Sequence, residues 1–244
     1  MVKIIAVLGG KGGCGKSTCS IGLSLALAEQ KQRVLLIDLD EGMRCLDMLL
    51  GVSEELLFDV SDAVAGRDLA SCVLQVPGNT GLSLLAAPGE KGLLDTTLLV
   101  RFIENIPNSM FDTVVLDLPA GSDLQLYKAL PPQTEFLCVC NPNAVSVRDA
   151  ANIGALLNKA NRNGKIILNR YQRYFIKNPV FSNLDDIIDE SGLMLLGIVP
   201  ESEGLYFAFL EGDYKIKGKA KKAFKRIALR LCGKNVALPK LKRI

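Results

Sequence analysis

The chain has 244 residues, of which 49% are apolar and 23% are charged, with 29 Lys or Arg against 26 Asp or Glu. This length and apolar content suit one sizeable core, and no apolar run is long enough to span a bilayer. The sequence has no histidine, which removes the commonest general base and the commonest metal ligand. It also shows no signal peptide, so we expect a cytoplasmic protein.

The charges are unevenly distributed along the chain. Residues 215–244 contain twelve Lys or Arg and no Asp or Glu, so residues 1–214 hold seventeen basic and twenty-six acidic residues. An acidic body with a basic end indicates an anionic partner surface.

Seven cysteines are scattered along the chain without a C-x-x-C pair, which indicates neither a disulfide framework nor a zinc ribbon. Cys138 and Cys140 alternate within EFLCVC and are expected to be core residues of a strand. A metal site at this pair is the alternative.

Strands and helices are expected to alternate along the chain. The expected strands are Lys3–Leu8, Arg33–Asp38, Leu82–Ala87, Thr113–Leu118, Glu135–Cys140, Lys165–Asn169 and Met194–Val199. The expected helices between them include Ser20–Gln30, Thr97–Glu104 and Val147–Asn161. This alternation predicts an α/β fold with a doubly wound, mainly parallel sheet, in which ligands bind beyond the carboxyl ends of the strands.

The first expected strand leads into GGKGGCGKST (residues 9–18), which contains the pattern G-x-x-x-x-G-K-[ST]. Its glycines let backbone N–H groups approach phosphate oxygens, and the helix that follows adds its positive end. Lys16 is expected to contact the outer phosphates and Ser17 to bind Mg²⁺. The order strand, loop, helix favours a phosphate-binding loop over a merely flexible glycine-rich turn. The expected nucleotide-binding residues of this loop are Gly10, Lys11, Gly12, Gly13, Cys14, Gly15, Lys16, Ser17 and Thr18.

Two further strands end in aspartates. Asp38 and Asp40 are two residues apart, so on an extended chain both carboxylates would point to the same side. Asp117 follows an apolar run and is suited to holding Mg²⁺ through water. Because there is no histidine, Asp40 is the best candidate to orient an attacking water. The alternative is that these aspartates lie on a solvated rim.

The expected base is adenine. Asn169 ends a strand and can present both a donor and an acceptor to an adenine edge. The segment LNRYQRY offers no aspartate two positions after Asn169 that would accept hydrogen bonds from guanine. We therefore expect ATP as the nucleotide.

The C-terminal region contains an amphipathic basic helix at about residues 217–232. Its apolar residues recur at i, i+3, i+4 and i+7, opposite a face of Lys and Arg. The helix either closes the domain with its apolar face docked, or lies on a membrane surface with anionic lipids. We expect one domain over residues 1–232 and a short basic tail over 233–244. In that tail Pro239 interrupts any helix, and four apolar residues would form a weak anchor: Val236, Leu238, Leu241 and Ile244.

Together, these segments resemble a known family. KGGCGKST resembles the deviant Walker A loop of the MinD/ParA ATPases, and the likeness extends over most of the chain. The family's further segments occur here in order as IDLDEGMRCLDMLLG (37–51), DLPAG (117–121), NPNAVSVRDA (141–150), LNRY (168–171) and GIVPE (197–201). The resemblance is greater to MinD-like division-site ATPases than to plasmid partition proteins, and it implies a P-loop NTPase fold of the SIMIBI type.

The resemblance also implies roles for single residues. In this family the lysine at the position of Lys11 reaches across an ATP-sandwich dimer to the partner's phosphates, where a cation can stabilise the charge of the transition state. The implied catalytic residues are Lys11, Lys16 and Asp40. The implied magnesium residues are Ser17, Asp38 and Asp117, and the implied adenine neighbours are Asn169, Pro200 and Glu201. Two positions depart from the family's pattern. Cys14 stands where a small aliphatic residue is usual, and Leu118 stands where serine is common in MinD-like proteins.

The expected function is that of a Mg²⁺-dependent ATPase. It would form an ATP-dependent homodimer and act as a positional or assembly switch, with slow hydrolysis that a protein partner stimulates. An anionic membrane is the first expected surface, which would place the protein peripherally on the inner face of the cell membrane, and DNA is the second. Two alternatives stay open: a regulator that binds nucleotide without hydrolysing it, and a metallocentre-assembly relative, which would need paired cysteines at a dimer axis.

Overall fold

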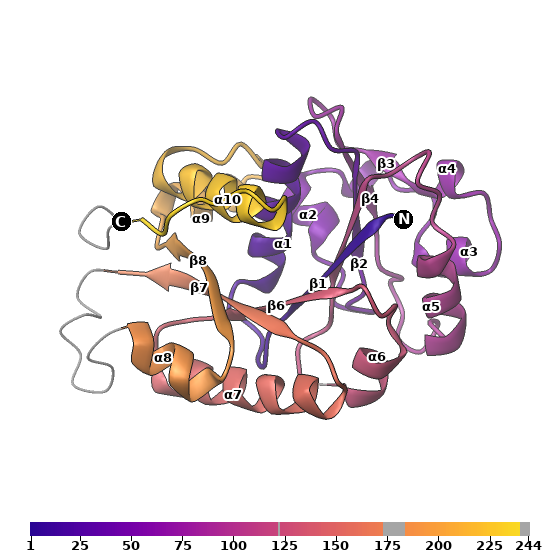
Figure 1. The fold of residues 1–244 in the computed structure, drawn as a ribbon. Helices are drawn as coiled ribbons and strands as arrows, with labels where there is room; N and C mark the ends of the chain where they lie inside the picture. Colours follow the sequence, from indigo (N-terminus) through magenta and orange to yellow (C-terminus); the bar gives the residue numbers. More distant parts are fainter. Residues whose placement is uncertain (122, 173–183, 240–244) are drawn as a thin grey trace.

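The computed structural model describes residues 1–121, 123–172 and 184–239. Its strands are β1 (Lys3–Leu8), β2 (Val34–Asp38), β3 (Leu74–Gln75), β4 (Leu82–Leu85), β5 (Thr113–Asp117), β6 (Glu135–Cys140), β7 (Gly164–Tyr171) and β8 (Met194–Pro200). They form one sheet in the order β3-β4-β2-β5-β1-β6-β7-β8 (Figure 1). The pair β3–β4 is antiparallel and the other pairs are parallel. The predicted doubly wound, mainly parallel sheet is confirmed.

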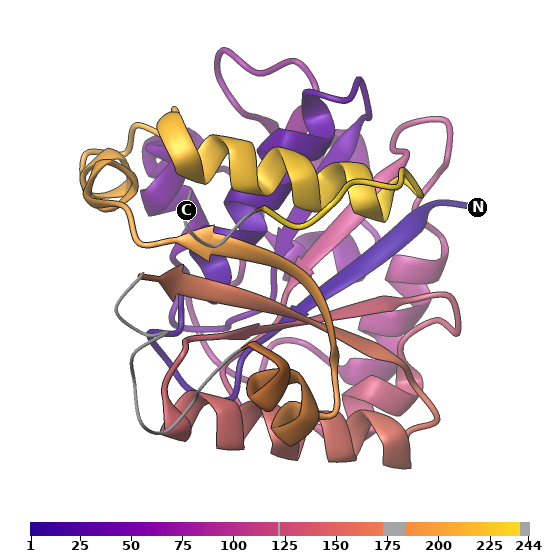
Figure 2. The same ribbon diagram turned by 60° about the vertical axis from the view of Figure 1, so that its left-hand side comes forward.

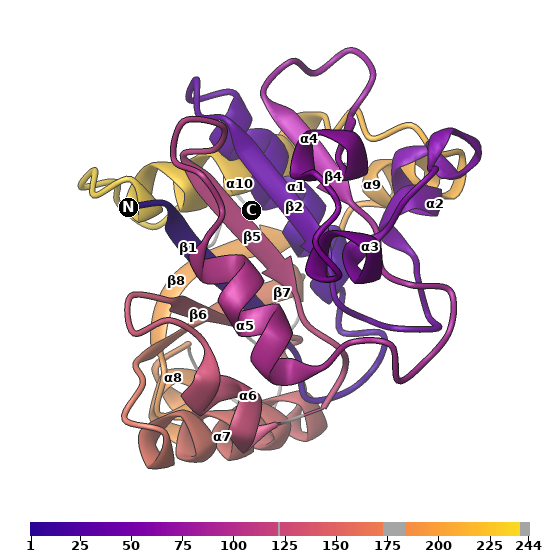
Figure 3. The same cartoon turned by 90° about the vertical axis from the view of Figure 1, so that its right-hand side faces the viewer.

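Helices cover both faces of this sheet (Figures 1 and 3). On one face lie α1 (Lys16–Ala28), α2 (Leu46–Leu50), α9 (Glu203–Leu210) and α10 (Gly218–Leu231). On the other face lie α3 (Val60–Val64), α4 (Leu69–Cys72), α5 (Thr96–Glu104), α6 (Leu124–Ala129), α7 (Ala144–Lys159) and α8 (Leu184–Ser191). A 3₁₀ turn, Ser53–Glu55, follows α2. Because both faces are covered, the central strands are continuous apolar runs rather than alternating ones.

The strand order places the ends of three strands next to one another. β5 lies between β1 and β2. Asp117, the last residue of β5, is in register with Val7 of β1 and with Asp38 of β2. The loops that leave these strands therefore meet at one edge of the sheet, which is where a parallel sheet binds its ligands.

Some element ends differ from the prediction. α1 begins at Lys16, four residues before the predicted start, because the glycine loop leads straight into the helix. α7 begins at Ala144, where the side chain of Asn143 accepts the N–H of Ser146 and caps the helix. The two-residue strand β3 was not predicted, because two residues are too few to show an alternating pattern.

The C-terminal helix α10 is packed against the body of the protein. Its buried residues are Ala220, Ala223, Phe224, Ile227, Ala228 and Leu231. They pack in the same core cluster as α1 and β8. A Cβ atom added at Gly22 of α1 would lie 2.4 Å from the Phe224 ring, so the two helices are in close contact. The expected anchor residues Leu241 and Ile244 lie outside the described residues.

Removing the ring of Phe224 should destabilise the whole domain. Phe224→Ala would leave a cavity between α1 and α10 and lower the free energy of unfolding by about 3–5 kcal/mol. Urea unfolding followed by circular dichroism measures this change. The control Lys222→Ala, on the exposed face of the same helix, should stay within about 0.5 kcal/mol of wild type. Equal stability of both variants would mean that α10 is not docked in solution.

Candidate functional site

The loop between β1 and α1 needs glycine at positions where another chain segment comes close. Gly15 has a φ of 90°, and a Cβ atom there would lie 2.2 Å from Nδ2 of Asn169. A Cβ atom at Gly10 would lie 2.5 Å from Cβ of Asp149. A larger residue at either position would displace the loop. Because these positions are glycine, phosphate oxygens can approach the backbone N–H groups of the loop.

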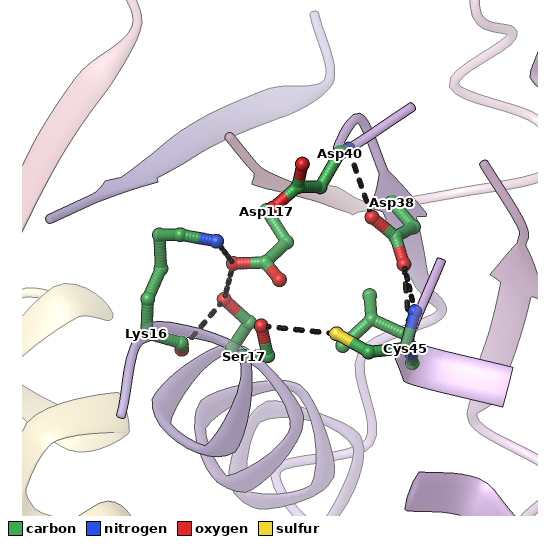
Figure 4. Close-up of polar contacts among 8 residues, drawn as sticks. Lys16, Ser17, Asp38, Asp40, Cys45 and Asp117 are labelled. Atoms are coloured by element: carbon green, nitrogen blue, oxygen red, sulfur yellow. Dashed lines mark hydrogen bonds and ion pairs between the residues drawn. The ribbon is translucent and has the colours of Figure 1, made fainter. Parts of the chain in front are cut away.

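A buried ion pair joins the loop to β5 (Figure 4). Nζ of Lys16 lies 3.2 Å from Oδ1 of Asp117, and the Ser20 hydroxyl donates a 2.9 Å hydrogen bond to the same oxygen. Burial lowers the pKa of Lys16, but the charge of Asp117 and its hydrogen bond raise that pKa by more. Lys16 therefore stays charged, as a group that binds phosphate must.

The same carboxylate suits a magnesium site. Burial raises the pKa of Asp117, while the charge of Lys16 and the nearby hydroxyls of Ser17 and Ser20 act in the opposite direction. Among the described residues, the other oxygen of Asp117, Oδ2, is buried and has no hydrogen-bond partner. The hydroxyl of Ser17 lies at the start of α1 beside this carboxylate, at 3.4 Å from Sγ of Cys45. Ser17 and Asp117 are hard oxygen ligands, so the donor set fits Mg²⁺, and the ion would supply positive charge to the phosphates.

Asp38 holds the backbone of the segment that follows β2. Its side chain is fully buried, and its Oδ1 accepts the N–H of Asp40 at 3.0 Å. Its Oδ2 accepts the N–H groups of Cys45 and Leu46, both at 3.2 Å. Burial raises the pKa of Asp38 to about 6. The expected position of Asp38 near Mg²⁺ stays a prediction, because in this structure both oxygens face backbone amides.

Asp40 lies two residues beyond the end of β2. β2 ends at Asp38, so Asp40 is not part of the extended chain that was expected to place both carboxylates on the same side. The half-buried carboxylate of Asp40 contributes to raising the pKa of Lys16, which places its charge near the loop. This position is compatible with the predicted role in orienting water.

Lys11 differs from Lys16 in its surroundings. Its side chain is 65% exposed, and its Nζ lies 3.7 Å from Oδ2 of Asp149 on α7. A hollow of about 150 Å³ beside it is lined by the loop residues 10–14 and by residues of β6, of α7 and of the loop between them. No role was predicted for Asp149, although it belongs to the segment NPNAVSVRDA. Ser20 was also missed; its position one helical turn after Lys16 was the available signal.

The predicted adenine neighbours come together around one cavity. Gly15, Thr18, Asn169, Pro200 and Glu201 all line a space of about 340 Å³. Its other lining residues come from the end of β7, from α2 and from α9 and the residue before it: Arg170, Met48, Leu49, Ser202, Leu205, Tyr206, Phe209 and Leu210. Nδ2 of Asn169 donates a 2.9 Å hydrogen bond to the carbonyl oxygen of Cys14, so this side chain also fixes the loop. A largely apolar cavity beside a phosphate loop fits a purine base.

Comparison with known protein families identifies the family of this chain. Residues 5–216 match the family described as the CobQ/CobB/MinD/ParA nucleotide binding domain. The chain belongs to this family. The predicted family is therefore confirmed, and with it the cofactors ATP and Mg²⁺.

The most similar relatives include MinD proteins. The septum site-determining proteins MinD of Helicobacter pylori and Bacillus subtilis are each 30% identical to this chain, over 97% and 98% of it and 92% of each relative. MinD in the MinC:MinD cell division protein complex of Aquifex aeolicus has a TM-score of 0.88 at 32% identity, covering 98% of this chain and 99% of that one. MinD of Pyrococcus horikoshii, complexed with Mg-ADP, has a TM-score of 0.80 at 28% identity, covering 95% and 96%. The chain is a MinD-like ATPase.

Replacing either proposed magnesium residue should raise the Mg²⁺ requirement. Asp117→Asn and Ser17→Ala each remove an oxygen ligand or its charge, so half-maximal ATP turnover should need at least about tenfold more Mg²⁺. Phosphate release at increasing Mg²⁺ measures this shift. Ser24→Ala is the matched control, because Ser24 lies further along α1 and donates its hydroxyl to the carbonyl of Ser20. If neither site variant shifts the Mg²⁺ curve relative to this control, the metal assignment is wrong.

Proposed function

We propose that this ATPase works as a positional or assembly switch that forms a homodimer around two ATP molecules. The observation that carries the proposal is the different placement of its two loop lysines. Lys16 is buried beside Asp117, at the proposed phosphate site of its own subunit, whereas Lys11 is mostly exposed and pairs with Asp149. An exposed cation beside the loop is available to the phosphates of a second subunit.

In this proposal the chain's own residues carry out ATP hydrolysis to ADP and phosphate. Asp40 accepts a hydrogen bond from the attacking water and orients it toward the γ-phosphate. Lys16 in the same subunit and Lys11 from the partner stabilise the negative charge of the transition state. The proposed catalytic groups are Lys16, Lys11 and the carboxylate of Asp40. With these groups alone, we expect hydrolysis to be slow until a protein partner stimulates it. The complex of the Aquifex relative with MinC supports a protein partner, and the stimulation of hydrolysis by such a partner is part of the proposal.

The surface on which the switch acts is proposed to be an anionic membrane, reached from the cytoplasm. Within the part of the chain that the structure describes, no helix has both the length and the apolar character to cross a bilayer. The exposed lysines of α10 favour an anionic surface, and DNA is the second candidate.

The two alternative functions have less support. A regulator that binds nucleotide without hydrolysis would need Lys16 and Asp117 for binding, but it would not need Asp40, which is proposed to orient water. A metallocentre-assembly protein would need an accessible pair of cysteines, but Cys138 and Cys140 are each 1% exposed in the interior of β6. Analysis of iron and nickel in protein purified without oxygen would test that second alternative.

Removing the charge of Asp40 should separate binding from hydrolysis. Asp40→Asn keeps the size of the side chain but lowers its ability to orient water, so ATP turnover should fall by about 10²–10⁴-fold. ATP binding should remain, because the loop backbone and Lys16 are intact. Phosphate release and equilibrium binding of a fluorescent ATP analogue measure the two effects. Turnover like that of wild type would remove Asp40 from the mechanism.

Replacing Lys11 should abolish dimerisation but spare nucleotide binding by the monomer. In an Asp40→Ala background, which accumulates ATP-bound protein, Lys11→Ala removes the cation that would reach the partner's phosphates. Light scattering with ATP should show a dimer for Asp40→Ala and a monomer for the double variant. Lys128→Ala, on the exposed surface of α6, is the control and should leave the dimer intact. Equal dimer populations in all three proteins would mean that Lys11 is only a solvated loop charge.

A further inference from the structure

Asp40 lies at the start of a tight turn between β2 and α2. The N–H of Met43 donates a 3.1 Å hydrogen bond to the carbonyl oxygen of Asp40, and Gly42 has the positive φ of 73° that this turn requires. Within the part of the chain that the structure describes, the carboxylate of Asp40 forms neither a hydrogen bond nor an ion pair. The backbone of the turn therefore sets where this carboxylate lies.

The segment that contains the turn is anchored at both of its ends. Asp38 accepts backbone N–H groups at the start of the segment and again at the beginning of α2. The end of α2 packs against the loop that follows α9, which Figure 2 shows end-on at the left edge. A Cβ atom at Gly51 would lie 2.7 Å from the carbonyl oxygen of Gly212 in that loop. These contacts restrain the ends of the segment but do not hold residues 41–43.

The side chain of Glu41 holds the turn from the outside. Its Oε1 accepts the N–H groups of Leu93 and Leu94 at 2.8 and 2.9 Å. Its Oε2 accepts the N–H of Gly92 at 3.3 Å. These three amides belong to the loop between β4 and α5. Hydrogen bonds to an ionised carboxylate are stronger than those between neutral groups, so one side chain joins two distant loops.

Two further contacts join the same turn to the same loop. The N–H of Gly42 donates a 3.1 Å hydrogen bond to the carbonyl oxygen of Pro88. A Cβ atom at Gly42 would lie 2.9 Å from Cγ of Lys91, so the lysine stem packs over the turn. The loop is anchored in turn, because it begins after β4 in the sheet and ends at Asp95, the N-cap of α5. The turn of Asp40 is thus fastened to a fixed part of the fold.

We propose that Glu41 is a positioning residue for ATP hydrolysis, which holds the turn so that the Asp40 carboxylate stays where it can orient the attacking water. Glu41 acts through Asp40, so its role rests on the proposed function of Asp40. A misplacement of about 1 Å can lower the rate of a reaction about a hundredfold, which makes such a restraint important for turnover. Nucleotide binding depends on the phosphate loop and does not require Glu41.

Removing the carboxylate of Glu41 should lower kcat and spare the KM for ATP. For Glu41→Ala we expect kcat to fall at least about tenfold, with KM within about twofold of wild type, as measured by phosphate release. Glu41→Gln keeps one oxygen, which can still accept the two shorter hydrogen bonds, so its kcat should stay within about threefold of wild type. The control Glu90→Ala removes an exposed carboxylate from the same loop and should behave as wild type.

A double variant tests whether Glu41 acts through Asp40. Asp40→Asn removes the group that Glu41 positions, so adding Glu41→Ala should change the remaining turnover by no more than about twofold. Multiplied effects of the two changes would mean that Glu41 affects turnover by another route, and the positioning role would be wrong. A rise in KM as large as the fall in kcat would also overturn it, because the site as a whole would then be disrupted.

Hydrogen exchange detects the contact of Glu41 with the loop independently of turnover. The amides of residues 92–94 should exchange at least about tenfold faster in Glu41→Ala than in wild type, as measured by mass spectrometry on peptides of this loop. Equal exchange would mean that the contact is not formed in solution. Faster exchange with unchanged kcat would mean that the contact is only structural. Faster exchange together with wild-type turnover of Asp40→Asn would refute the proposed role of Asp40, and the positioning role with it, although the contact exists.

Discussion

The buried pair of Lys16 and Asp117 is the interaction on which the rest of the site depends. Both groups are almost inaccessible to water, and a buried charge is tolerated only when a partner compensates it. Asp117 can hold this position because β5 lies at the centre of the sheet between β1 and β2. The lysine is thus kept charged and close to where phosphate oxygens bind, before any nucleotide arrives.

The surrounding residues follow from this arrangement of strands. β1 supplies the glycine loop, β2 supplies Asp38 and, just beyond its end, Asp40, and β7 supplies Asn169, which binds the loop from the other side. A parallel sheet brings such strand ends together even though they are separated in sequence. The chemistry of the site is therefore assembled from single polar residues at the ends of apolar strands.

The sequence predicts the sheet, the phosphate loop and Asp117 because each produces a local signal: an apolar run, a glycine pattern or an acid at a strand end. The sequence does not predict which hydrogen-bond partner a polar side chain has when several donors or acceptors are near. Asp38 binds backbone amides here, and the amide of Asn169 binds the carbonyl of Cys14. The ion pair of Lys11 with Asp149 joins residues that are far apart in sequence, and no periodicity reveals it. The amphipathic pattern of α10 likewise gives the same signal for docking to a core and for binding a membrane, and only the packed structure distinguishes them.

The hydrogen bond from Asn169 to Cys14 affects how tightly the phosphate loop can bind a nucleotide. A glycine-rich loop that sampled many conformations would lose that freedom when it closed around phosphates, and the loss would weaken binding. Here a side chain from β7 already restrains the loop in the free protein, and Gly15 fits against that side chain without room for a Cβ atom. Much of the entropy of loop closure is therefore lost during folding. The stability of the domain and its affinity for nucleotide are consequently linked, so substitutions that loosen β7 should weaken nucleotide binding even where they touch no atom of the ligand.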